Sequence, residues 1–226
     1  MEIVALSPSS ATVLKGHLNI GKLLQDAARY RGRMPSGNRN DRSVVLWVRL
    51  GHAVALLGSD LEETGGREEG WSAIVLSDIK RKTASAFKVP HHGSKTSHLD
   101  SVWTKLLELN LPSVITPWKV AARSLPTRQD VERLQALTGE LYVTTIPQNK
   151  RRERTEEVEQ MIALTALDMG KVLSTDGHVR LRANADGKPT KWTTELFNGA
   201  RRIKGKMAKT FFDPGSQQNT KRLRLR

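Results

Sequence analysis

Two adjacent histidines, His91 and His92, follow the short apolar segment 86–89, and a glycine and a serine come directly after them. Imidazole is the commonest metal ligand in proteins and titrates near neutral pH. In α/β proteins, reactive groups gather where strands end. Asp60 occupies a similar place after the apolar run 53–57. One carboxylate and two imidazoles at the ends of successive strands predict part of a metal site.

Each of these residues, taken alone, also has a structural interpretation. Asp60 would serve as the N-cap of the turn that follows it. A histidine pair alone is weak evidence for a metal site, since many histidines are only helix caps or solvent-exposed surface residues. The other histidines fit that description: we expect His17 and His178 at the surface and His52 in an exposed hairpin turn. The combination of residues at strand ends therefore supports a site more strongly than any member does.

The elements that must position this group alternate along the chain. The pattern of apolar residues predicts strands at 2–6, 43–50, 53–57, 86–89, 113–116 and 141–145, and helices at 11–30, 71–80, 99–109 and 128–137. The strand–helix alternation over 86–145 is typical of a layered α/β domain. The charged stretch 148–170 is interpreted as an insertion, and 177–182 with 191–196 predicts a further strand pair.

Two strings of residues resemble a known family. SVVLWVRLGHAVALLGSDLEE, at 43–63, and FKVPHHGSKTSH, at 87–98, resemble the second half of a metallo-β-lactamase-fold hydrolase. The most similar subgroup is the metallo-hydrolase domain of bacterial DNA-uptake (competence) channel proteins. The resemblance extends from about residue 2 to 145 and resumes at 174–196. It implies an α/β fold: the C-terminal half of an αββα sandwich, followed by a basic C-terminal extension.

The resemblance also implies roles for individual residues. Asp60 matches the aspartate that bridges two metal ions, and His92 matches the last metal ligand. His91 would face the scissile phosphate or donate a proton, and Asn40 would hold a loop nearby. The expected cofactor is a pair of divalent ions, zinc or manganese. The residues expected to bind substrate or shape the pocket are Ser94, Lys95, Thr96, Ser97 and Trp118.

The chain departs from the family in one respect. The signature His-x-His-x-Asp-His, which supplies most of the metal ligands, does not occur in it. The isolated chain is therefore expected to lack a complete two-metal site, and half a sandwich exposes a sheet face and edge. Three interpretations stay open: a second polypeptide supplies the other half, the true reading frame begins upstream, or the chain is a non-catalytic nucleic-acid-binding or scaffold subunit that kept the fold.

The charge of the chain suits a polyanionic substrate. The formal net charge is +14, and the basic residues are concentrated near the C-terminus. We expect a metallo-β-lactamase-like domain at 1–198 and a basic, flexible tail at 199–226. That tail would either aid solubility or contact nucleic acid without sequence preference. Its last basic residues are Lys221, Arg222, Arg224 and Arg226.

Composition excludes several other classes. The chain has no cysteine, so disulfides, thiolate metal sites and cysteine nucleophiles are ruled out. It has no apolar run long enough to span a bilayer and no visible secretory signal, so we expect a cytoplasmic protein. Trp47, Trp71 and Trp103 lie in apolar patterns and are expected in the core. The sequence predicts a phosphodiesterase- or nuclease-like metallo-hydrolase, with a small-molecule ester or lactam substrate left open.

Overall fold

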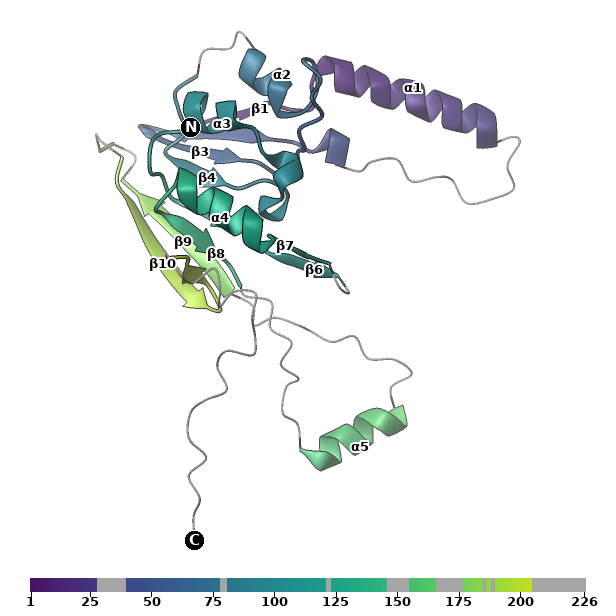
Figure 1. Cartoon of the computed structure of the whole chain (residues 1–226), viewed down its shortest axis with the longest axis vertical. Helices are drawn as coiled ribbons and strands as arrows, with labels where there is room; N and C mark the ends of the chain where they lie inside the picture. Colours follow the sequence, from purple (N-terminus) through teal and green to yellow (C-terminus); the bar gives the residue numbers. More distant parts are fainter. Residues whose placement is uncertain are drawn as a thin grey trace.

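The computed structural model describes residues 1–27, 40–77, 81–120, 123–145, 155–165, 177–184, 186–187 and 190–204. These residues form a mixed α/β structure built on one seven-stranded sheet, with two small two-stranded sheets beside it (Figure 1). The α/β class predicted from the sequence is thus confirmed. In the described ranges, no helix has the length and apolar character needed to cross a bilayer.

The main sheet has the order β1-β2-β3-β4-β5-β8-β11. Its strands are β1 (Glu2–Ala5), β2 (Leu46–Leu50), β3 (Ala53–Leu57), β4 (Ala86–Lys88), β5 (Ser113–Ile115), β8 (Leu141–Val143) and β11 (Arg201–Arg202). The first three strands are antiparallel neighbours, whereas β3, β4, β5 and β8 run parallel to one another. The carboxyl ends of β3 and β4 therefore meet at one edge, and both predicted ligand segments begin there.

Five α-helices lie in the described ranges: α1 (Ser10–Ala27), α2 (Gly70–Leu76), α3 (Asp100–Lys105), α4 (Arg128–Leu137) and α5 (Glu156–Thr165). Helix α4 has the predicted bounds because Thr127 and Asp130 form a capping box. Helix α3 is shorter than predicted, since Leu107 instead forms a β-bridge with Ala84. Helix α5 lies within the stretch interpreted as a charged insertion.

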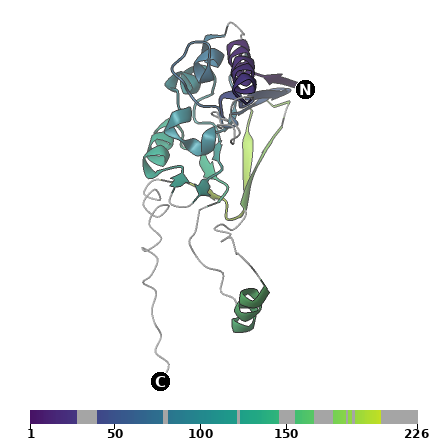
Figure 2. The same cartoon turned by 90° about the vertical axis from the view of Figure 1, so that its right-hand side faces the viewer.

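The core lies on one face of the sheet, beneath α2, α3 and α4 (Figures 1 and 2). Phe87 of β4 packs edge-to-face against Trp71 of α2 and against Trp103, with ring centroids 6.4 and 5.3 Å apart. Trp47 is buried on the same face. The prediction that these three tryptophans belong to the core is therefore confirmed, and this packing fixes β4 beneath the helices.

The opposite face of the sheet is covered in part by a hairpin of β9 (Gly177–Ala183) and β10 (Trp192–Asn198) (Figure 2). Trp192 of this hairpin donates its indole N–H to Ser85 Oγ at 3.1 Å. Over β1, β2 and β3 the same face carries Ile3, Leu50 and Leu57, which are 55%, 53% and 38% exposed. Part of this sheet face therefore exposes apolar side chains to solvent.

Two small elements were not predicted from the sequence. A hairpin of β6 (Trp118–Val120) and β7 (Arg123–Leu125) extends from the sheet after β5 (Figure 1). Arg201 and Arg202, assigned to the tail by the sequence analysis, instead form β11 because the adjacent Ile203 is buried in the core. The fold therefore continues past residue 198. Lys221, Arg222, Arg224 and Arg226 lie outside the described residues.

Gly177, at the start of β9, is a position where a side chain does not fit. A Cβ atom there would lie 2.3 Å from the carbonyl oxygen of Thr144 and 2.5 Å from the amide nitrogen of Ala200. We expect Gly177→Ala to lower the free energy of unfolding by about 1–3 kcal/mol, the typical cost of overpacking. Gly187→Ala is the matched control, since its Cβ would lie no closer than 3.5 Å to a neighbour. Urea denaturation measures both, and equal stability of the two variants would contradict the prediction.

Candidate metal centre

The ends of β3 and β4 are joined by backbone contacts that bring the two predicted ligand segments together. The amide of Gly58 donates to the carbonyl of Lys88 at 3.0 Å, and the amide of His91 donates to the carbonyl of Ser59 at 2.9 Å. A Cβ atom at Gly58 would lie 2.9 Å from both Lys88 O and Pro90 Cβ. Glycine is therefore required there for the two turns to approach each other.

Three non-glycine residues beside this contact adopt left-handed backbone conformations. Ser59, His91 and His92 have φ values of 49°, 43° and 56°, and Gly93 follows with a φ of 83°. Such conformations cost about 1–3 kcal/mol each outside glycine and concentrate at functional sites. The strain falls on the residues that carry the predicted chemistry, so the turn geometry supports a function here beyond simple chain reversal.

His92 and Asp60 face each other across the gap between the two turns. His92 Nε2 lies 3.9 Å from Asp60 Oδ1. The other ring nitrogen, Nδ1, lies 2.8 Å from the carbonyl oxygen of Thr116, which can only accept a hydrogen bond, so Nδ1 carries the proton. In the neutral imidazole this places the Nε2 lone pair on the side of Asp60. This orientation by a backbone carbonyl is typical of metal-ligating histidines.

The distance between these two atoms is close to that of two ligands of one ion. Zinc–ligand bonds to nitrogen and oxygen measure about 2.0–2.2 Å, so two ligands of one tetrahedral zinc ion lie about 3.4 Å apart. His92 Nε2 and Asp60 Oδ1 lie 3.9 Å apart, so a shift of about half an ångström would bring both into the coordination sphere of one ion. However, no group of three or more histidine, cysteine, aspartate or glutamate side chains in the described ranges could hold a metal ion. The described residues therefore offer two candidate ligands and not a complete set.

His91 is held by a separate network on the far side of the turn. Its Nδ1 lies 2.9 Å from Glu62 Oε1 and 3.1 Å from Thr96 Oγ1, which itself donates to Glu62 Oε1 at 3.0 Å. Asn40 Nδ2 lies 3.4 Å from His91 Nε2. Asn40 therefore reaches the site, as the sequence analysis expects. A carboxylate at Nδ1 and an amide donor at Nε2 together orient this imidazole.

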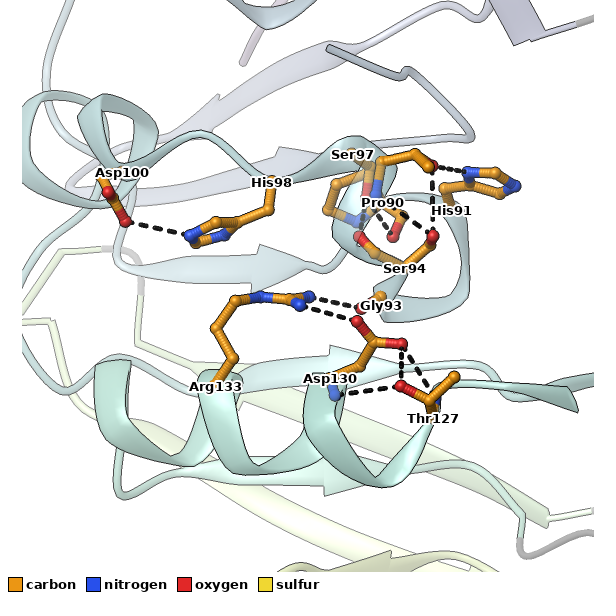
Figure 3. Close-up of polar contacts among 11 residues, drawn as sticks. Pro90, His91, Gly93, Ser94, Ser97, His98, Asp100, Thr127, Asp130 and Arg133 are labelled. Atoms are coloured by element: carbon orange, nitrogen blue, oxygen red, sulfur yellow. Dashed lines mark hydrogen bonds and ion pairs between the residues drawn. The ribbon is translucent and has the colours of Figure 1, made fainter.

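The hydroxyl groups of the serines predicted to bind substrate form hydrogen bonds within the turn. Ser94 and Ser97 are buried, and both hydroxyls bond to nearby groups of the turn: Ser94 caps the following 3-10 turn through Thr96 N, and Ser97 donates to Pro90 O and Ser94 O (Figure 3). Lys95 and Thr96 are exposed. A role in substrate binding remains a prediction for all four. Their observed contacts hold the His-His-Gly turn in shape.

Arg133 of α4 supports the turn from below. Its Nη2 donates to the carbonyl of Gly93 at 2.8 Å, and its Nη1 donates to Asp130 Oδ1 at 2.6 Å (Figure 3). Burial would raise the pKa of Asp130, but hydrogen bonds from Thr127 and Arg133 outweigh it, so this pKa lies below its ordinary value. A charged pair that anchors a helix cap is therefore also attached to the candidate metal site.

The depressed pKa of Asp130 predicts a pH dependence of stability. A carboxyl whose pKa is lower in the folded state stabilises the fold above its unfolded pKa of about 3.9, and this contribution is lost as pH falls through the folded value. We expect the urea concentration at the unfolding midpoint to decrease as the pH is lowered below about 4. In Asp130→Asn this decrease should be smaller. Asp100→Asn, which alters an exposed carboxyl, is the control. The same acid dependence in Asp130→Asn and the parent would contradict the assignment.

Sequence reasoning missed several residues of this site. Glu62 and Arg133 reach it only through the tertiary fold, although the carboxylate of Glu62 two residues after Asp60 was a usable signal. Lys88 was also missed: burial lowers its pKa, and the charge of Asp60 opposes that shift only in part. His98 does not join the pair, because its Nε2 faces Asp100 Oδ1 at 3.0 Å (Figure 3).

Comparisons with known proteins leave the family of the chain open. No protein-family model matches it, and searches of curated proteins and of solved structures find no significant match. The residues and geometry of the candidate centre therefore carry the functional argument.

Proposed function

We propose that this chain contributes part of the active site of a metal-dependent hydrolase of the metallo-β-lactamase type, acting on phosphodiesters. The observation that carries the proposal is the distance of 3.9 Å between His92 Nε2 and Asp60 Oδ1, with His92 Nδ1 donating to the carbonyl oxygen of Thr116. Within that proposal, the sheet and its helices correspond to the C-terminal half of an αββα sandwich. A bound pair of zinc or manganese ions would polarise the phosphoryl oxygen and stabilise the leaving group.

The residues of the chain have distinct tasks in this reaction. Asp60 and His92 would hold the metal, and the hydrogen bond from His92 Nδ1 to Thr116 O would keep Nε2 directed toward it. The ring of His91 lies 6.0 Å from that of His92, centroid to centroid, and is oriented by Glu62. In this proposal it contacts the phosphate or its leaving oxygen. These tasks require the strained turn, because His91 and His92 are consecutive residues after β4 and their imidazoles must point in different directions.

The remaining ligands would come from a second polypeptide. The two ligands contributed by the described residues fall short of the set that a dinuclear site requires. The exposed apolar face over β1, β2 and β3, which carries Ile3, Leu50 and Leu57, is a surface on which such a partner would pack. The free energy gained by burying these side chains would offset part of the entropic cost of association.

An alternative function is a non-catalytic nucleic-acid-binding or scaffold subunit. The net charge of +14 favours it, because positive charge alone supplies affinity for a polyanion. The exposed side of the β9–β10 hairpin adds Arg180 and Arg182, although both pair with Glu195. This alternative requires no metal and gives no role to the strained turn.

Metal content distinguishes the two functions. The chain would be purified alone and together with the product of a neighbouring gene, and zinc and manganese would be measured by mass spectrometry. The proposed hydrolase predicts about two ions per complex and loss of bound metal in His92→Ala. His178→Ala, on the outer hairpin, is the matched control. A metal-free complex with full affinity for DNA would favour the binding subunit.

A further inference from the structure

One of the five tryptophans differs from the others in its surroundings. Trp47 and Trp71 are buried, Trp103 packs against the core, and Trp192 is partly buried and donates to Ser85. Trp118, at the start of β6, is 40% exposed. An indole left in water forgoes the large gain from burying an aromatic ring. Trp118 is therefore the tryptophan of the chain with the most ring surface available to a ligand.

Trp118 lies directly beside the candidate metal ligands. Its ring is nearly parallel to that of His92, with an interplanar angle of 22° and centroids 6.0 Å apart. The geometry is set by the backbone: Thr116, which accepts the hydrogen bond from His92 Nδ1, is separated from Trp118 by Pro117 alone. The β6–β7 hairpin then extends outward from the sheet (Figure 1). The exposed indole is thus held in a defined position beside the reaction centre.

We propose that Trp118 is a stacking platform for an unpaired nucleobase, so that the substrate of this site is a single-stranded polynucleotide. This inference rests on the proposed function, since it names the substrate class of the same site. A phosphodiester at Asp60 and His92 places the adjoining nucleoside next to Trp118, and an exposed indole face accepts any base. The net charge of +14 attracts the polyanion.

The same geometry disfavours two other substrates. In a duplex each base is already stacked on its neighbours, so contact with Trp118 would require a costly unstacking step. A small ester or lactam without a planar ring would leave the indole uncovered. Stacking on a tryptophan contributes about 1–3 kcal/mol per base, which corresponds to about a 5- to 150-fold difference in affinity.

The test separates stacking from charge. The full chain, without added metal, would be titrated with an oligothymidylate of about twelve nucleotides and with an abasic oligomer of equal charge, because such lengths are within the usual site size. The parent is expected to bind the oligothymidylate at least about 5-fold more tightly than the abasic oligomer. In Trp118→Ala this ratio should fall to near one, while Trp118→Phe should keep most of it. Leu109→Ala, at a 98% exposed position, is the control for a surface apolar change.

The outcomes also separate this inference from the proposed function. A parent ratio near one, an unchanged ratio in Trp118→Ala, or absence of binding to both oligomers would overturn the stacking role. The same would follow if the parent bound the oligothymidylate equally well after it was annealed to its complementary strand. Because no hydrolysis is measured, the control Asp100→Ala, which removes an 89% exposed carboxylate that pairs with His98, is expected to keep the parent ratio. A chain that stacks bases in this assay but carries no metal in any complex would uphold the platform and refute the hydrolase.

Discussion

Replacement of Asp60 by alanine is expected to reduce metal-dependent phosphodiester hydrolysis by at least about 100-fold, since even groups one shell beyond a metal typically change affinity or activity 10- to 100-fold. Asp60 lies opposite His92 Nε2, and the carboxylate is the group expected to hold both ions together. The measurement is hydrolysis of a single-stranded oligonucleotide by the chain purified with the polypeptide that completes the site, at saturating zinc or manganese.

The side chain of Asp60 is 48% exposed, so its removal should leave the fold intact. Asp100→Ala removes a carboxylate that is 89% exposed and pairs with His98 instead. It should therefore leave hydrolysis unchanged. If Asp60→Ala kept activity within a few-fold of the parent, with metal still bound, the carboxylate would not be a ligand and the proposed centre would be refuted.

Replacement of Arg133 by methionine is expected to lower the free energy of unfolding by about 3 kcal/mol, the lower end of the cost of breaking a buried ion pair. Arg133 is 20% exposed and Asp130 is 5% exposed, so the change leaves a buried carboxylate without its cation. It also removes the donor to the carbonyl of Gly93, next to His92. Methionine retains much of the apolar stem, so the effect reports the lost charge and hydrogen bonds.

Helix α4 offers a matched control for this variant. Arg128 pairs with Glu132 one turn along the same helix, but both side chains are about half exposed. Arg128→Met should therefore cost no more than about 0.5 kcal/mol. Thermal and urea denaturation measure both changes. In addition, Arg133→Met should weaken metal binding by about 10-fold in the completed site, as expected for a supporting residue. Equal stability of the two variants would show that the contacts of Arg133 with Asp130 and Gly93 do not stabilise the packing of α4 against the turn.

Much of the fold was predictable because its elements are locally encoded. The hairpin of β2 and β3 follows from two apolar runs joined at Gly51, and α4 begins at a capping box with Thr127 that the sequence itself contains. The short strands β6, β7 and β11 were not predictable, because each depends on its neighbour. Arg201 and Arg202 form a strand because they pair with β8 while the adjacent Ile203 is buried in the core.

The sequence by itself determined which groups are available for chemistry: the carboxylate of Asp60 after β3, two imidazoles after β4, no cysteine, and a large positive charge. Only the tertiary structure decided how these groups are used. The Asp60–His92 distance, the choice of Thr116 as hydrogen-bond acceptor, and the supporting positions of Glu62 and Arg133 arise from segments far apart in the chain. Local patterns specify strands and turns, but a site is defined by distances between them, and packing sets those distances.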